Sequence, residues 1–257
     1  MLQRRVIPTL LLKGDALVKT IQFRSPVYVG DPCNTVEIFN EMEVDELVFL
    51  DISPNRHRHG PNFRLLENIA SECFMPLAYG GGISNIEQAE KLFKIGFEKV
   101  IINTTGVKNP QLLYQLSEKF GSQAVVAAVD YRRNKKGKRE LHIEGGRTNT
   151  HRDILEWCTE VENLGVGEIL LTSIDREGTW SGFDQELAQR VALNSDVPVI
   201  VHGGAGSLED IYELFKETEA SAVGIGSYFV FQKQGMGVLV NMPQRNEIDS
   251  MLKRFVE

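Results

Sequence analysis

An acid stands at the end of an apolar run in the middle of the chain. Residues 125–129 are all apolar, and Asp130 follows them directly. A carboxylate at the end of a buried strand can give a proton to a bound substrate or take one from it. Residues 6–12 form a second run of the same shape, but Leu11 occupies the position that corresponds to Asp130. Because leucine transfers no proton, only one of these two positions offers a group that could act as an acid or base.

Two glycine-rich stretches have the composition of anion sites. "GGGIS" begins at Gly80 and "GGAGS" begins at Gly203, and each lies between an apolar run and a helical pattern. Glycine lets backbone N–H groups approach an anion, and a helix N-terminus favours negative charge. Polar strand ends accompany both stretches: Asn103 and Thr104, then Gly226 and Ser227. We therefore expect two phosphate pockets and a substrate with two phosphates. The alternative is that the glycines only make tight turns and helix caps.

The elements that must position these residues repeat along the chain. Eight apolar runs of strand length, most of them continuously apolar, alternate with helical patterns. One helix is expected to begin with a capping box formed by Ser84 and Glu87, and another follows Ser207. Eight such units in one chain predict a (β/α)₈ TIM barrel, a single domain over residues 1–257. A doubly wound open sheet is the rival, but it does not need eight evenly spaced units. The eight runs are 5–11, 46–52, 76–80, 99–103, 124–130, 168–174, 197–203 and 221–226.

The barrel is predicted to consist of two fused half-barrels, about 1–122 and 123–257. The two glycine stretches are offset by 123 residues, and "LFK" recurs at an offset of 122. Internal similarity at a fixed period is the mark of repeated structural units. On this register Leu11 and Asp130 end the first and fifth strands.

Composition limits the classes of function. The chain has 257 residues and a formal net charge of -7, so we expect no nucleic-acid partner. Three scattered cysteines form no disulfide framework, which favours a reducing cytoplasm. No apolar run reaches 18 residues, so no membrane span is expected.

Several longer stretches resemble a known family. "GDP" at 30–32, "DELVFLDI" at 45–52, "GGGI" at 80–83, "FGSQAVV" at 120–126 and "GEILLTSIDREGTWSG" at 167–182 are similar to the cyclase subunit of imidazole glycerol phosphate synthase. The resemblance covers nearly the whole chain. It implies a lyase-type subunit of a glutamine amidotransferase that needs no cofactor or metal.

The resemblance also implies a route for ammonia. A glutaminase subunit would dock on the N-terminal face of the barrel, and its ammonia would pass through to the mouth. There it would attack a ribonucleotide with two phosphates, giving imidazole glycerol phosphate and an aminoimidazole carboxamide ribotide. The matched phosphate-binding positions are Gly82, Asn103 and Thr104 in one half and Gly178, Gly204 and Ser227 in the other, with Lys19 as a further phosphate ligand. The matched ammonia gate is Arg5, Glu46, Lys99 and Glu168. From spacing alone, a solvated ion cluster is the favoured interpretation of these four residues, whereas the presence of all four favours a retained ammonia route.

The family pattern breaks at the mouth. The resemblance implies a second catalytic carboxylate at Leu11, and a serine at His202. Glu177 replaces an aspartate, Ile101 a small polar residue and Val27 an arginine. His202 could serve as an acid or base, or only as a hydrogen-bonding residue that lines a pocket.

These departures favour a paralogue with weakened or lost cyclase chemistry. Such a subunit would relay ammonia to a separate amidotransferase that amidates a nucleotide-linked sugar for surface (lipo)polysaccharide synthesis. An active cyclase of histidine biosynthesis is the alternative. The basic stretch 131–140 is expected to form a hairpin with exposed lysines, or else to steer a phosphorylated substrate.

Overall fold

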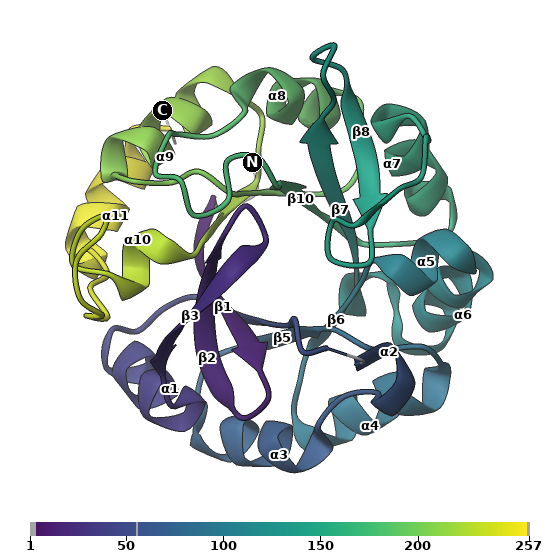
Figure 1. The fold of residues 1–257 in the computed structure, drawn as a ribbon, viewed down its shortest axis with the longest axis horizontal. Coiled ribbons are helices and arrows are strands. Elements are labelled where there is room, and N and C mark those ends of the chain that lie inside the picture. The colour runs from purple at the N-terminus through teal and green to yellow at the C-terminus, as the bar shows by residue number, and fades with distance from the viewer. Residues whose placement is uncertain (1–3, 55, 256–257) are drawn as a thin grey trace.

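Eight parallel strands close into a barrel surrounded by helices in the computed structural model, which describes residues 4–54 and 56–255 (Figure 1). The strands follow the order β10, β11, β12, β1, β4, β5, β6, β7, and pairing between β7 and β10 closes the ring. The predicted TIM barrel is confirmed. Its origin from two half-barrels stays a prediction. The barrel strands are β1 (Arg5–Lys13), β4 (Leu47–Asp51), β5 (Leu77–Gly80), β6 (Lys99–Ile102), β7 (Val125–Arg133), β10 (Glu168–Ser173), β11 (Val199–His202) and β12 (Ala222–Ile225).

Helices pack around the barrel and bury their apolar faces against it. Ser207 caps α9 as expected, because its hydroxyl accepts a hydrogen bond from the Asp210 amide at 3.1 Å. The predicted cap of α4 was wrong by one residue. Asn85 caps that helix through the Gln88 amide at 2.9 Å, whereas Ser84 bonds to the Gln88 side chain. The helices are α1 (Pro32–Glu41), α2 (Arg56–His59), α3 (Phe63–Glu72), α4 (Ile86–Ile95), α5 (Thr104–Lys108), α6 (Gln111–Phe120), α7 (Ile154–Asn163), α8 (Gln185–Leu193), α9 (Leu208–Glu217), α10 (Ser227–Val230) and α11 (Arg245–Lys253), with a 3₁₀ turn at Ser122–Ala124.

Alternate residues of each barrel strand point inward. Ile7 of β1 and Val126 of β7 belong to one buried cluster inside the barrel. Continuing the two-residue period of a strand brings Leu11 and Asp130 to the same inner face, nearer the mouth. Since β1 and β7 are four strands apart in either direction round the ring, these two residues lie on opposite sides of the mouth.

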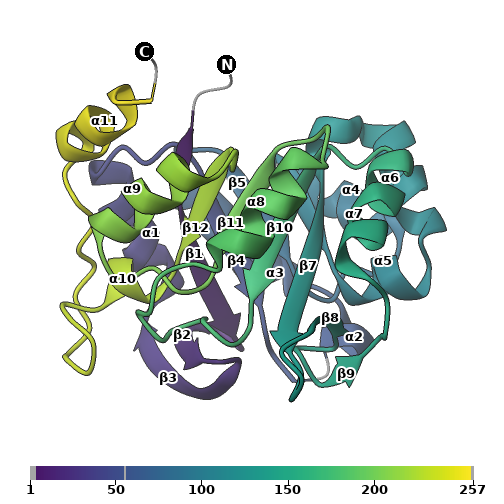
Figure 2. The same ribbon diagram turned by 90° about the horizontal axis from the view of Figure 1, so that it is seen from above.

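Two antiparallel extensions surround the mouth. One is β2 (Ala16–Ile21) with β3 (Arg24–Gly30), and the other is β8 (Arg139–Ile143) with β9 (Thr148–Asn149). Figure 2 shows both at one end of the barrel, while the chain termini lie at the other. The predicted basic hairpin is the one formed by β7 and β8. No helix of the described residues is long and apolar enough to cross a membrane.

Candidate active site at the mouth of the barrel

One carboxylate and one leucine mark the two sides of the mouth. Asp130 is half-buried, and its backbone lies opposite Thr172 of β10 and His142 of β8. Leu11 is 6% exposed and pairs with Leu50 of β4. The site therefore offers a carboxylate from β7 and an apolar side chain at the corresponding position of β1.

A small pocket brings together the second set of predicted phosphate-binding residues. It is lined by Glu177, Gly178, His202, Gly203, Gly204, Ala205, Gly224, Gly226 and Ser227. Gly178 and Gly204 come from two separate loops and Ser227 begins α10, so their meeting supports the interpretation of the glycine stretches. Their role in binding phosphate stays a prediction.

Close backbone packing explains two of these glycines. Gly178 has φ of +72°, and a β-carbon there would lie 2.2 Å from the carbonyl oxygen of Thr20. At Gly204 a β-carbon would lie 2.0 Å from the carbonyl oxygen of Gly182. Neither backbone neighbour can rotate away as a side chain would. The absence of a side chain is thus a structural requirement at both positions.

Gly178→Ala is expected to lower the free energy of unfolding by at least about 3 kcal/mol, because backbone conformation and backbone contact both oppose the methyl group. Gly14→Ala is the matched control. Gly14 has φ of +62° but nothing within 4 Å of its β-carbon position, so only the conformational cost of about 1 kcal/mol remains. Urea unfolding measures both variants. Equal losses would show that the Thr20 contact is unimportant.

A buried lysine and a buried glutamate flank this pocket. Lys19 is 4% exposed, and its ammonium donates to the carbonyl oxygen of Thr9. Burial lowers the pKa of Lys19 to about 8, although the charge of Glu177 opposes the shift. Burial raises the pKa of Glu177, whose carboxylate accepts from the Thr20 hydroxyl at 2.9 Å and the Phe23 amide at 3.0 Å. Lys19 keeps donor capacity for an anion, since an ammonium has three N–H groups.

His202 shares this space as an uncharged group. The residue is 5% exposed, and among the described residues its Nδ1 has no hydrogen-bond partner. Burial, and then the charge of Lys19, lower the pKa of His202 to about 3. A β-carbon at Gly226 would lie 3.0 Å from Lys19 Nζ and 3.8 Å from His202 Nε2, so both nitrogens face the same glycine. A neutral imidazole with so low a pKa is a poor general acid near pH 7.

Gly224 is a site residue that sequence reasoning missed. A β-carbon at this position would lie 3.1 Å from His202 Cδ2, so the glycine makes room for the imidazole. The available signal was an isolated glycine inside a strand, which often marks close approach of another group.

The first set of predicted phosphate ligands lies after two adjacent strands, β5 and β6. Gly82 has φ of +71° in the loop before α4. The Asn103 amide donates to the carbonyl oxygen of Ala128 at 3.1 Å, and the Thr104 hydroxyl accepts from the Glu144 amide at 2.9 Å. These side chains already join β6 to β7 and to the hairpin, and their contact with phosphate stays a prediction.

The four predicted gate residues form a closed ring at the opposite end of the barrel. Arg5 bridges Glu46 at 2.7 Å and also contacts Glu168. Lys99 bridges the same two carboxylates at 2.9 and 3.0 Å. Because the side chains of Glu46 and Glu168 are only 6% exposed, this is not a solvated surface cluster. Whether the ring conducts ammonia stays a prediction.

Other departures from the family pattern also lie near the mouth. Ile101 joins the buried cluster inside the barrel, where it adds apolar surface below the site. Val27 is exposed on β3 and so presents an apolar side chain where the resemblance implies a cation. Both changes make the mouth less polar.

Comparisons with known proteins agree with this geometry. The family model described as histidine biosynthesis protein matches residues 5–234. A putative imidazole glycerol phosphate synthase subunit hisF2 of Pseudomonas aeruginosa strain PAO1 is 49% identical over 97% of this chain and 99% of its own length. A putative subunit HisF of Leptospira borgpetersenii is 42% identical over 98% of this chain and 99% of its own. The subunit HisF of Hydrogenobaculum sp. strain Y04AAS1 is 41% identical over 96% and 98%. With its barrel and these full-length matches, the chain belongs to the histidine biosynthesis protein family and is a HisF-like subunit of the imidazole glycerol phosphate synthase type.

Proposed function

We propose that this subunit relays ammonia from a glutaminase to an acceptor at the barrel mouth and has lost most of its own cyclase activity. The observation that carries the proposal is Leu11, which faces the mouth from the strand opposite Asp130. Cyclisation moves protons at different atoms, and one group must donate while another accepts. Without the second carboxylate, turnover is expected to fall by a factor of about 10² to 10⁴.

The relay itself is supported by the other end of the barrel. The ring of Arg5, Glu46, Lys99 and Glu168 is intact at the N-terminal end of the barrel, where ammonia from a glutaminase would enter. We therefore place a glutaminase on this N-terminal face. The acceptor we propose is a nucleotide-linked sugar on a separate amidotransferase, whose amidated product enters surface polysaccharide synthesis.

An active cyclase of histidine biosynthesis is the second candidate. Asp130 and the second glycine pocket favour it, and Lys19 is a buried amine of lowered pKa that can carry a proton near pH 8. On this view, Lys19 would replace the missing carboxylate.

Leu11→Asp distinguishes the two candidates. We expect little turnover of the two-phosphate ribonucleotide with free ammonium by the unchanged chain, and at least about a hundredfold more by the variant, because the acid pair is then restored. Adding Asp130→Asn to Leu11→Asp should abolish the gain. Rapid turnover by the unchanged chain would overturn the relay proposal and support the cyclase.

The acceptor needs its own measurement. The chain, its glutaminase and the candidate amidotransferase would be mixed with a nucleotide-linked sugar and glutamine labelled with ¹⁵N at the side-chain amide. We expect label in the sugar only when this chain is present. Equal labelling without the chain would contradict the relay.

A further inference from the structure

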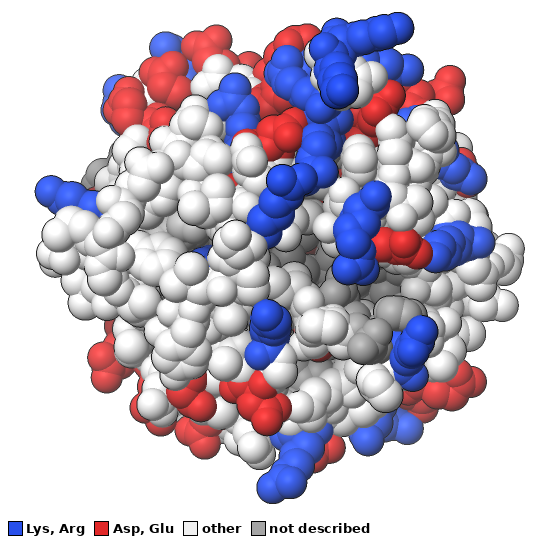
Figure 3. Space-filling model, viewed as in Figure 1, with Lys and Arg blue, Asp and Glu red and all other residues white. Residues whose placement is uncertain are grey.

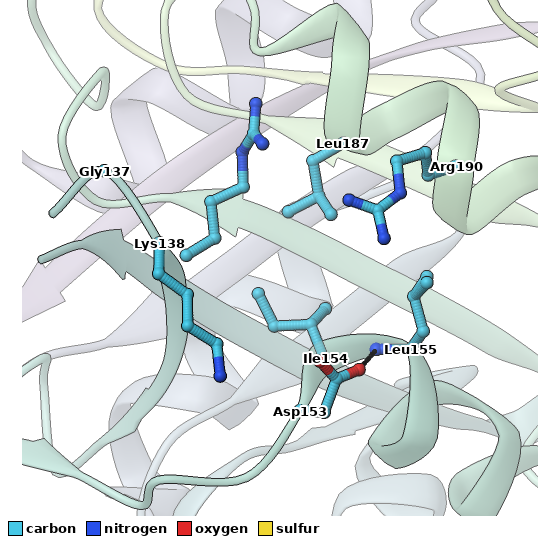
Figure 4. A pocket seen from close by; sticks show the side chains of 8 residues that line it. Gly137, Lys138, Asp153, Ile154, Leu155, Leu187 and Arg190 are labelled. Atoms are coloured by element: carbon cyan, nitrogen blue, oxygen red, sulfur yellow. Dashed lines mark hydrogen bonds between the residues drawn. The ribbon is translucent and has the colours of Figure 1, made fainter.

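A second cavity lies outside the barrel wall, away from the mouth site. It has a volume of about 230 Å³ and lies between the β7–β8 hairpin, the start of α7 and α8 (Figure 4). It shares no lining residue with the glycine pocket. Six of its lining side chains carry the argument: Lys138, Arg139, Asp153, Ile154, Leu187 and Arg190.

The floor of this cavity is apolar. Ile154 begins α7 and Leu187 lies on α8, and each is 3% exposed. Leu155 adds a partly buried apolar edge. Because Ile154 and Leu187 are already almost fully covered, they offer a ligand only a narrow apolar contact, which the edge of one ring could cover.

Two of the charged groups at the rim already have hydrogen-bond partners, although the partners of Asp153 are amides and leave its negative charge in place. Arg139 makes a paired contact with Asp184 at 2.7 and 2.8 Å and also bridges Glu186 at 2.8 Å. The carboxylate of Asp153 caps α7 through the amides of Leu155 and Glu156. Neither side chain is free to hold a ligand charge by itself.

Among the described residues, two exposed cations of the lining form no direct ion pair, although the charge of Lys138 contributes to lowering the pKa of Glu140. Lys138 and Arg190 are exposed and form no ion pair with any residue between 4 and 54 or 56 and 255. Figure 4 shows Lys138 reaching down from the hairpin and the guanidinium of Arg190 pointing over the cavity from α8. An anion between them would satisfy both, and Arg190 offers planar paired donors for a phosphate or carboxylate.

The elements that carry these cations are held in place. Asn134 fixes the hairpin tip, because its side-chain oxygen accepts from the amides of Lys136 and Lys138 at 2.9 and 3.1 Å. The Arg139–Asp184 pair ties the hairpin to the start of α8, and Asp184 is buried. A ligand would therefore meet a preformed backbone, and the main ordering cost would be that of the exposed Lys138 and Arg190 side chains.

We propose that this cavity binds a small amphipathic anion, with one phosphate or carboxylate between Lys138 and Arg190 and a single apolar ring on Ile154 and Leu187. The volume lies below the range of about 300–1,000 Å³ typical of sites for drug-sized ligands, which limits the body to roughly one ring. Occupancy would join α8 to the hairpin whose inner strand carries Asp130, so the site is suited to an effector.

Phenyl phosphate tests the site, with methyl NMR spectra of the whole chain as the readout. We expect saturable shifts of the Ile154 and Leu187 methyl signals, with a dissociation constant on the order of a millimolar. Arg190→Met should weaken this binding at least tenfold. Lys135→Met is the matched control, because Lys135 is a cation of the same hairpin that does not line the cavity, and it should leave the affinity unchanged.

Three results would overturn the proposal: unshifted Ile154 and Leu187 signals, unchanged affinity in Arg190→Met, or phenol bound as tightly as phenyl phosphate. Inorganic phosphate, which lacks the ring, should bind more weakly than phenyl phosphate at these signals. Failure here would leave the proposed ammonia relay intact, since that rests on Leu11 and the ion ring at the barrel bottom.

Discussion

Lys99→Met is expected to lower the free energy of unfolding by about 3 kcal/mol. Lys99 neutralises Glu46 and Glu168 at the barrel bottom, and both carboxylates are nearly buried. Without it, Arg5 alone faces two negative charges. Removing one member of a buried ion cluster typically costs about 3–5 kcal/mol, since a charge is left uncompensated. We take the lower end because Lys99 itself is 20% exposed.

Lys94→Met provides the matched control for this effect. Lys94 bridges Glu90 at 2.8 Å on the outer face of α4, but its side chain is 73% exposed. Water and salt screen such a pair, so its loss should change stability by less than about 0.5 kcal/mol. Urea unfolding at pH 7 measures both variants. Equal, small losses would mean that the ring is effectively solvated and that its burial contributes little.

The barrel was predictable because its determinants are local and repeated. Continuous apolar runs reveal strands that are buried on both faces, and eight of them with helices between leave few architectures. The cap of α9 by Ser207 could be predicted because capping also depends on the local sequence. The cap of α4 was misread because Ser84 and Asn85 are both good capping residues, and only the structure shows which side chain reaches the Gln88 amide.

The mouth could be predicted only in part. The glycine stretches and Asp130 can be identified in the sequence from their residue types and from their position after a strand. The burial of Lys19 beside His202 does not, because it depends on a hairpin folding back over the barrel. The space that Gly224 and Gly226 leave for these two side chains likewise arises from strand register, which no local pattern specifies.

The Lys138–Arg190 cavity was outside the reach of sequence reasoning altogether. The basic stretch 131–140 was expected to be an exposed hairpin or a steering surface, and the hairpin is confirmed. Figure 3 shows Lys and Arg side chains gathered along it toward the mouth. The sequence could not indicate that Arg139 forms an ion pair with Asp184. Nor could it indicate that Lys138 and Arg190 line the same cavity, together with Ile154 and Leu187.

His202→Ser is expected to make the protein markedly more resistant to acid. The folded chain holds the pKa of His202 at about 3, below its ordinary value of 6.5. Between these two pKa values, His202 binds a proton in the unfolded chain but not in the folded one. Stability is therefore lost as the pH falls from 6.5 toward 3. Between pH 7 and pH 4 this one group should account for a loss of roughly 3 kcal/mol, because each pKa unit corresponds to about 1.4 kcal/mol.

The measurement is the free energy of unfolding in urea at pH 7 and pH 4. In His202→Ser the difference between the two pH values should shrink by most of that amount, since serine has no proton to bind. His151→Ser, at an exposed histidine, should leave the difference as it is in the unchanged chain. If the difference in unfolding free energy between pH 7 and pH 4 is the same in His202→Ser as in the unchanged chain, the imidazole of the folded chain already carries a second proton. Its Nδ1 would then be a hydrogen-bond donor. The pocket would then hold two cations, Lys19 and His202, and would bind an anion far more strongly than a neutral imidazole allows.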